Sequence, residues 1–367
     1  MKKILLGSTA LLALSLTGTA QAAEKIKLGV SGYMWQEIGI SDSRAGQTTV
    51  NLVSNTEVHF KGSTTLDNGL EIGADIQLEG NSQAADQIDE SYAWIESKTW
   101  GKLILGTENG VGDLITTHAP SVGPMGVDGS NATYWVSNPS GNNALTTIDV
   151  AGSGDHEKVI YISPKLGGAF QVGASYTPAS DAEDGKGPSS KTVNTYNIWE
   201  ATALIDTTIA GVGVRTSASY QHGSDDTGFD NIASASAGLN LSYAGFTLGG
   251  GYGRTISSNR AGTANNLVNG WAYNVGISYV TGPYGVSLGM HHGVSSGDPN
   301  DAGAQEKFDT AELGFSYKLS DGVDLKSGVS YVRFEEDVEL TATSGAVGTP
   351  EYENDGWVWI NGIYLSF

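Results

Sequence analysis

The sequence contains no cysteine and only 9 prolines among its 367 residues. Without cysteine no disulfide can form, so the stability of the fold must come from hydrogen bonding and packing. Glycine is abundant, with 51 residues, and there are 16 tyrosines and 8 tryptophans. Low proline with many glycines and aromatics is unlike a disordered chain and is typical of a β-rich protein with many tight turns.

Basic residues are also scarce. The chain has 19 Lys and Arg against 40 Asp and Glu, a formal net charge of −21. Nucleic-acid binding needs a basic footprint to neutralise phosphates, so this balance argues against a nucleic-acid partner.

The N-terminus has the pattern of an export signal. A basic start at Lys2 and Lys3 precedes an apolar stretch over 4–16, and Ala20-Gln21-Ala22 offers a cleavage site. The apolar stretch is too short for a membrane span of about 20 residues. We therefore expect a signal peptide at 1–22 and a mature domain at 23–367. Loss of the two lysines leaves 17 basic against 40 acidic residues, a formal charge of −23.

No apolar run of about 18 residues follows the signal, which leaves no candidate for a transmembrane helix. Lipid can otherwise be crossed only by a closed barrel, because every backbone group must find a partner inside the protein. The exported domain is thus either a soluble β-protein or a transmembrane barrel, and the pattern of side chains distinguishes them. Apolar residues alternate with small or polar residues over 70–79, 170–177, 271–279 and 311–319.

The polar side of these segments is rich in Gly and Ser, and Tyr or Trp recurs near the ends of the apolar side. A transmembrane strand shows this pattern over about 9–11 residues, with aromatic girdles at the membrane interfaces. Short turns such as Asp67-Asn68-Gly69 alternate with long polar connections, as in outer-membrane barrels. The sequence therefore predicts an all-β, 16-stranded antiparallel barrel, although 14 or 18 strands remain open. The expected strands are 25–39, 50–65, 70–80, 88–98, 101–107, 157–164, 169–177, 193–207, 212–222, 232–243, 246–255, 270–280, 284–292, 308–319, 323–335 and 356–367.

Three features carry a resemblance to a known family. The last segment ends in Phe367, with Ile363 and Leu365 on the same face; the opening 26–33 reads as a first barrel strand; and a long third loop covers 107–156. On these residues the chain resembles the general porins of Gram-negative outer membranes, especially those of alphaproteobacteria. The resemblance implies a homotrimer in the outer membrane with one aqueous pore per subunit and the third loop folded into each barrel as its constriction. It also implies contact with lipid and lipopolysaccharide, and recognition of Phe367 by the barrel assembly machinery.

A pore selects solutes by size and electric field, so its working parts are charges at a constriction. The candidates in the loop are Glu108, Asp113 and Asp128, with Asp149 and Asp155 as weaker ones; each carboxylate could instead be a solvated loop charge. The other candidates lie on expected strands and point inward. They are Lys27, Glu57, His59, Lys61, Glu71, Asp75 and Arg215. Few of these candidates are basic, and no tight Arg cluster is visible. We therefore expect a water-filled channel for ions and small hydrophilic solutes that prefers cations; a substrate-selective porin is the alternative.

Signals for other chemistry are weak. Gly293-Val294-Ser295-Ser296-Gly297 matches the G-x-S-x-G pattern of a nucleophile elbow, but no helix is expected after it. The adjacent His291 and His292 should point to opposite faces of a strand, so they cannot clamp one metal together from that strand. We predict no catalytic residue and no required cofactor, with a barrel enzyme as the weakest alternative. Acidic external loops could hold Ca²⁺, though without the spacing of an EF-hand; the carboxylates concerned are Asp181, Glu183, Asp184, Asp225, Asp226 and Asp230.

Overall fold

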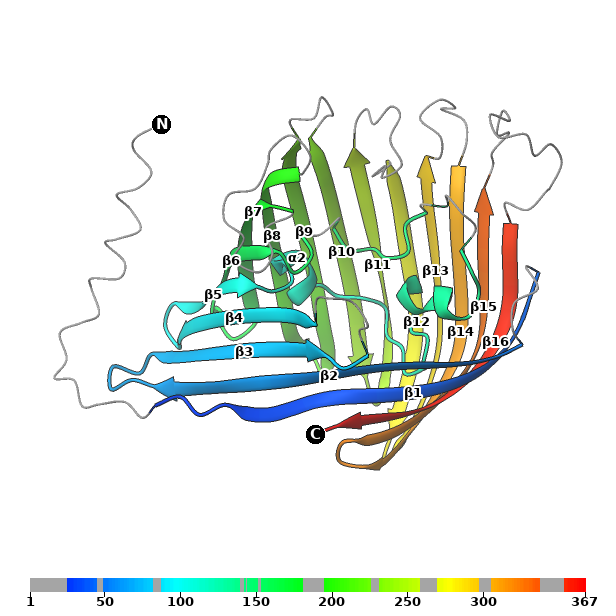
Figure 1. The fold of residues 1–367 in the computed structure, drawn as a ribbon, viewed down its shortest axis with the longest axis horizontal. Helices are drawn as coiled ribbons and strands as arrows, with labels where there is room; N and C mark the ends of the chain where they lie inside the picture. Colours follow the sequence, from blue (N-terminus) through cyan, green and yellow to red (C-terminus); the bar gives the residue numbers. More distant parts are fainter. Residues whose placement is uncertain are drawn as a thin grey trace.

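A computed structural model describes residues 25–44, 49–81, 87–138, 142, 144–150, 153–180, 195–225, 231–257, 269–296, 305–336 and 353–367. Sixteen antiparallel strands in these ranges close into one barrel. Every strand pairs with its neighbours in sequence, and β1 (Gly29–Ser43) pairs with β16 (Glu353–Ser366) to close the sheet (Figure 1). This confirms the predicted all-β class and the strand count of sixteen.

The other strands lie close to the predicted ranges. They are β2 (Val50–Thr65), β3 (Glu71–Glu79), β4 (Ile88–Ser97), β5 (Gly101–Thr107), β6 (Glu157–Ile162), β7 (Phe170–Ala179), β8 (Thr195–Ile209), β9 (Val212–Asp225), β10 (Ile232–Tyr243), β11 (Phe246–Ser257), β12 (Gly270–Thr281), β13 (Tyr284–Ser296), β14 (Gln305–Ser320) and β15 (Val323–Glu336). The largest differences lie where strands meet the long connections. There β1 runs four residues later than predicted, and β13 ends four residues later. The ladder continues through polar residues at these ends, so an apolar alternation could not mark them.

The side chains alternate between a lipid face and a lumen face, as the sequence predicted. On β12, Trp271, Val275 and Ile277 are exposed on the outside, whereas Asn274 and Ser278 point inward and are buried. This is the reverse of a soluble protein, because the apolar face here meets lipid and the polar face meets the lumen and the loop inside it.

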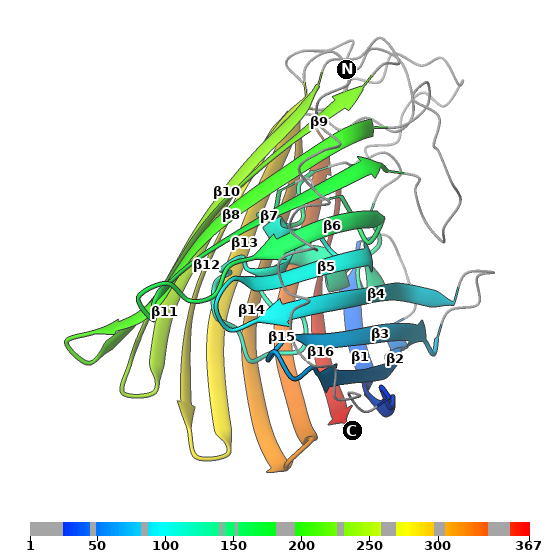
Figure 2. The same cartoon turned by 90° about the vertical axis from the view of Figure 1, so that its left-hand side faces the viewer.

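Tight turns join the strands at one end of the barrel (Figure 2). In the turn between β8 and β9, Ala210 and Gly211 both have positive φ, 51° and 84°. Two consecutive positive φ angles match the right-handed twist of the strands that a two-residue hairpin joins. Outward aromatic residues gather beside these turns, as expected of a girdle at a membrane interface. They are the exposed Tyr243, Phe246, Tyr284 and Tyr317 and the half-buried Tyr279.

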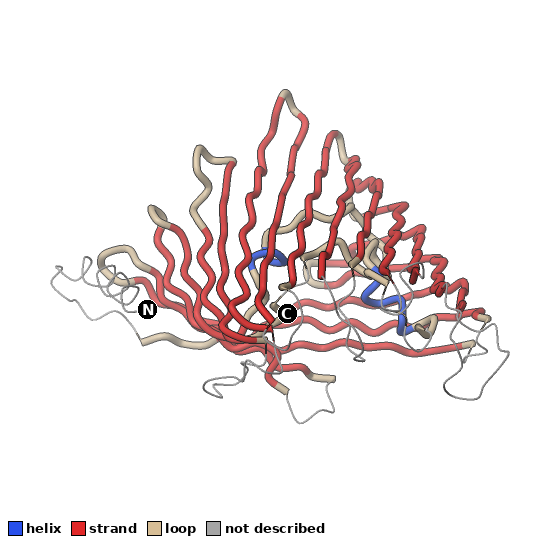
Figure 3. Tube along the Cα trace, turned by 90° about the horizontal axis from the view of Figure 1, so that it is seen from above, coloured by secondary structure: helices blue, strands red, loops and turns tan. Residues whose placement is uncertain are grey.

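The third loop, between β5 and β6, folds into the barrel (Figure 3). It contains two short helical segments that the sequence did not predict, α2 (Val111–Leu114) and the 3₁₀ helix η1 (Gly129–Tyr134). The loop residue Trp135 packs into a buried cluster with Phe308 and Phe334 of the inner wall. This cluster is the largest apolar core inside the barrel among the described residues, and it fixes the loop against the wall. No helix in the described ranges is long and apolar enough to span a membrane.

Candidate functional site

The third loop is held against the inner wall by two buried carboxylates. Glu312 on β14 accepts hydrogen bonds from the backbone N–H groups of Met125 and Gly126, at 2.9 and 3.1 Å. Glu200 on β8 accepts one from the N–H of Gly112, at 2.9 Å. A buried N–H that loses its acceptor costs about 1–3 kcal/mol, so these two residues fix the far and near parts of the loop.

Glycines on the wall let the loop backbone approach closely. A Cβ atom at Gly238 on β10 would lie 1.8 Å from the carbonyl oxygen of Thr117. A Cβ atom at Gly293 on β13 would lie 1.8 Å from the carbonyl oxygen of Leu145. Any side chain at either position would therefore push the loop into the lumen.

The predicted loop carboxylates have different surroundings. Glu108 is buried where the loop leaves β5, and its Oε1 accepts a hydrogen bond from the N–H of Asn109 at 2.9 Å. Asp113 lies on α2 with its side chain exposed to the lumen. The surrounding protein, and then the charge of Asp149, raise the pKa of Asp113 above its usual range. Asp155 is half-buried where the loop returns to β6.

Asp128 and Asp149 meet at His118, a residue that the sequence analysis did not single out. His118 Nδ1 lies 2.5 Å from Asp128 Oδ2, and His118 Nε2 lies 3.0 Å from Asp149 Oδ1. Burial acts to lower the pKa of His118, but contacts with these two carboxylates outweigh it and raise the pKa to about 10. Burial opposes ionisation of Asp128, yet the contact with His118 holds the pKa of Asp128 well below its usual range.

A second charged group lies on the inward face of β2 and β3, and it unites four predicted residues. His59 Nε2 lies 2.9 Å from Glu57 Oε1, and His59 Nδ1 lies 3.6 Å from Asp75 Oδ1. Lys61 Nζ lies 2.8 Å from Asp75 Oδ2. The register places these side chains next to one another across the β2–β3 ladder, so they form one connected network, which we call the β2–β3 network.

The remaining predicted residues lie apart from this network. Glu71 accepts a hydrogen bond from Trp94 Nε1 at 3.3 Å and lies four residues from Asp75 on β3, nearer the short turn between β2 and β3. Arg215 on β9 lies 3.8 Å from Asp206, near the tight turn between β8 and β9. Lys27 is exposed and precedes the first residue of β1. The structure thus brings Glu57, His59, Lys61 and Asp75 together, and leaves these three elsewhere.

The comparison with known proteins agrees with this geometry. A family model described as Gram-negative porin matches residues 7–337. The chain belongs to the Gram-negative porin family. The family model covers Gram-negative porins at large, so the alphaproteobacterial type stays a prediction. A search of curated proteins found no significant match.

Solved porin structures share the fold at low sequence identity. The anion-selective porin from Comamonas acidovorans is 16% identical, with a TM-score of 0.62 over 94% of this chain and 100% of that one. OmpF of Salmonella typhi, solved with daunomycin, is 15% identical, with a TM-score of 0.61 over 94% and 100%. OmpT of Vibrio cholerae in a trimer form is 13% identical, with a TM-score of 0.61 over the same shares. Together the family and the fold place this porin in the outer membrane, which it crosses as a multi-pass β-barrel channel.

The enzyme-like signals of the sequence have structural explanations. Ser295 lies within strand β13 and donates a hydrogen bond to Glu306 at 3.2 Å, so it is on no strand-to-helix elbow. His291 points inward, and His292 packs outward against Trp271 and Tyr273, as the strand alternation predicted. The G-x-S-x-G pattern is therefore part of a barrel strand, although its last residue, Gly297, lies outside the described residues.

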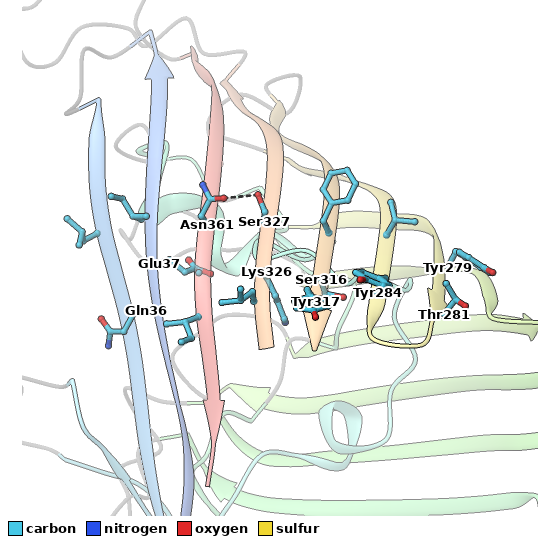
Figure 4. Close-up of a pocket in the computed structure, with 18 residues that line it drawn as sticks. Gln36, Glu37, Tyr279, Thr281, Tyr284, Ser316, Tyr317, Lys326, Ser327 and Asn361 are labelled. Atoms are coloured by element: carbon cyan, nitrogen blue, oxygen red, sulfur yellow. Dashed lines mark hydrogen bonds between the residues drawn. The ribbon is translucent and has the colours of Figure 1, made fainter. Parts of the chain in front are cut away.

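The outer face carries a groove of about 890 Å³ between β1–β2 and β12–β16 (Figure 4). Outward apolar residues make up much of its lining, among them Leu52, Tyr284 and Phe315. Asn361 and Ser327 also lie there and hydrogen-bond each other at 2.9 Å across neighbouring strands. An apolar groove on this face suits lipid or a neighbouring subunit rather than a soluble ligand.

The sequence analysis missed the residues that anchor the loop. Glu312 and Glu200 both occupy inward positions of strands, where Gly, Ser and Thr are the commoner residues. A large charged residue at such a position needs a partner inside the barrel. An inward Glu on a strand could therefore have been predicted to bind the loop. His118 had no comparable signal, because it meets its partners within an irregular loop that has no periodic pattern. His291 had none, because its partner Asp128 comes from a segment distant in sequence.

Proposed function

We propose that this porin is a diffusion channel that passes ions and small hydrophilic solutes and prefers cations. The observation that carries the proposal is the imbalance of charge around the lumen. In the β2–β3 network, His59 and Lys61 already pair with Glu57 and Asp75, so neither basic residue of this network faces the lumen as an uncompensated charge. Asp113, on the loop, keeps its side chain exposed to the lumen. Carboxylates around a narrow pore attract cations and exclude anions.

The test is the conductance of the purified porin in a planar lipid bilayer under a salt gradient. We expect discrete conductance steps and a reversal potential of the sign that cation preference gives. An anion-preferring reversal potential would contradict the selectivity and leave the channel intact, whereas an absence of steps would contradict the channel itself. Liposome swelling with sugars and amino acids of graded size would separate a general diffusion pore from a substrate-selective porin, the alternative.

We also propose that the porin assembles as a homotrimer. The apolar groove beside β1 and β16 offers a surface for a neighbouring subunit, and OmpT of Vibrio cholerae has been solved in a trimer form. We expect an oligomer that resists SDS at room temperature and separates into monomers on heating. Migration as a monomer without heating, with the barrel still folded, would contradict the trimer.

Phe367 is proposed as the residue that the assembly machinery reads. It is exposed at the end of the chain, and its backbone N–H donates a hydrogen bond to the carbonyl of Gly32 at 3.1 Å. Phe367→Ala should reduce the amount of folded barrel in the outer membrane while leaving refolding in detergent unchanged. Lipopolysaccharide contact and Ca²⁺ in the acidic external loops stay predictions, because most of the carboxylates concerned lie outside the described residues.

A further inference from the structure

Three side chains of the third loop, His118, Asp128 and Asp149, lie within reach of one ion, and His291 of β13 lies beside Asp128. We propose that they form a binding site for one divalent transition-metal ion, for which Zn²⁺ is the probe. The loop carboxylates belong to the proposed pore, but a metal site among them is a separate property of the porin.

The three loop residues already have the compactness of a ligand set. One donor atom from each of His118, Asp128 and Asp149 can be chosen so that all three lie within 4.8 Å of one another. Zinc–nitrogen and zinc–oxygen distances of about 2.0–2.2 Å place tetrahedral ligand atoms about 3.3 Å apart. Closing the set around an ion therefore needs shifts on the order of 1 Å per side chain.

His291 provides an independent observation. Its side chain is fully buried, and its Nε2 lies 3.0 Å from the carbonyl oxygen of Leu145, to which only an N–H can bond. In the neutral ring the other nitrogen, Nδ1, then carries a lone pair. Nδ1 has no hydrogen-bond partner and lies 3.6 Å from Asp128 Oδ1. With the neutral ring, two electron-rich atoms face each other in a buried place, and a cation that binds both would stabilise this arrangement.

The bonds around the four residues orient them as metal ligands. Asn274 Nδ2 donates to Asp128 Oδ1 at 2.8 Å, and Thr147 Oγ1 donates to Asp149 Oδ2 at 2.5 Å. Asp149 thus keeps Oδ1 for an ion, and Asp128 keeps Oδ2 together with the second lone pair of Oδ1, which faces His291. Among the described residues, Asp149 Oδ1 and His118 Nδ1 are buried without hydrogen-bond geometry to any partner, despite their short contacts. Metal-binding histidines and carboxylates characteristically have such second bonds, including the bond from a ring N–H to a backbone carbonyl.

The donor set selects the class of ion. Two imidazole nitrogens with two carboxylate oxygens suit Zn²⁺ and its neighbours, whereas Ca²⁺ and Mg²⁺ take oxygen ligands almost exclusively. The ion can arrive from the pore, because the side chains of His118, Asp128 and Asp149 are each 21–28% exposed. A bound dication displaces the proton of His118, so the net charge of the site rises by one. It should therefore also weaken cation preference; this last consequence rests on the proposed function.

The test is isothermal titration of the folded porin in detergent with Zn²⁺, after treatment with chelator. We expect one Zn²⁺ per chain, and Co²⁺ bound at the same site should show the visible absorption of tetrahedral coordination. His118→Gln and His291→Gln should each weaken binding at least about tenfold, as the loss of a ligand does. His292→Gln is the matched control, because this neighbouring histidine points outward against Trp271 and Tyr273 and should leave binding unchanged.

Three outcomes would overturn the site: no saturable binding by the wild type, binding that both histidine variants retain, or equal competition by Ca²⁺. Heat-modifiable mobility checks that each variant is folded. If His291→Gln fails to fold, Asp149→Ala in the loop provides the second variant and should also weaken binding. In the bilayer, Zn²⁺ should lower the cation preference of the wild type only. Intact Zn²⁺ binding without this electrical effect would contradict the proposed selectivity and not the metal site.

Discussion

The two sides of the lumen use the same acidic residues in different ways. On the side covered by the third loop, Glu200 and Glu312 are buried and accept hydrogen bonds from loop backbone N–H groups. On the side of β2 and β3, Glu57 and Asp75 pair with basic side chains, one of which, Lys61, remains half-exposed. A carboxylate on the first side therefore determines the shape of the pore, and one on the second side determines its charge.

The largest change in conductance and stability should come from removing Glu312, the carboxylate that holds the third loop against the wall. Glu312→Ala leaves the N–H groups of Met125 and Gly126 without their acceptor, which should cost about 2–4 kcal/mol of folding free energy. The loop should detach locally, so single-channel conductance should rise and become noisy. Bilayer recording and the temperature of heat-modifiable unfolding measure the two effects.

Glu96→Ala is the control for this variant. Glu96 is an exposed residue of β4, on the other side of the lumen, and touches no part of the loop in any hydrogen bond among the described residues. Equal changes in conductance from both variants would mean that Glu312 acts through its charge alone, and the distinction between the two sides would fail.

The second largest change should come from a glycine substitution, which tests the contact between the third loop and the wall without changing any charge. Gly293→Ala places a methyl group 1.8 Å from the carbonyl of Leu145, whereas in Gly213→Ala the nearest atom is Ser242 Cβ at 3.4 Å. Overpacking of this kind costs about 1–3 kcal/mol. We expect Gly293→Ala to lower thermal stability and alter conductance, and Gly213→Ala to change neither. Identical behaviour of the two variants would show that the loop does not press on β13.

The sequence was sufficient for the barrel and insufficient for the site. Alternation along β12 and the short turns predicted the strands, because each of these signals lies within about ten consecutive residues. The bonds between Asp128 and Asn274, or between Met125 and Glu312, join residues 146 and 187 positions apart. No periodicity encodes such pairs. The β2–β3 network was predictable as a group because its members are inward residues of one hairpin.

The third effect concerns charge on the β2–β3 side. Asp75→Asn removes a negative charge from the lumen and Lys61→Met removes a positive one, so the reversal potential should move in opposite directions. Asp75→Asn should reduce cation preference and Lys61→Met should increase it. A unit charge about 4 Å from a passing ion contributes about 1 kcal/mol in water, or about a fivefold change in the permeability ratio. Shifts in the same direction would show that the two variants act by distorting the hairpin.

The smallest effect should come from a basic residue of the same lumen far from this network. Arg215→Met removes a full positive charge, but Arg215 lies near the tight turn between β8 and β9, beside Asp206. Charges are screened beyond about 8–10 Å at ordinary ionic strength, so the reversal potential should move much less than in Lys61→Met. The ratio of the two shifts at 0.1 M and at 1 M salt measures this screening. A shift as large as that of Lys61→Met would place the selective part of the pore at the short-turn end, because only charges close to the narrowest part of the path can control which ions pass.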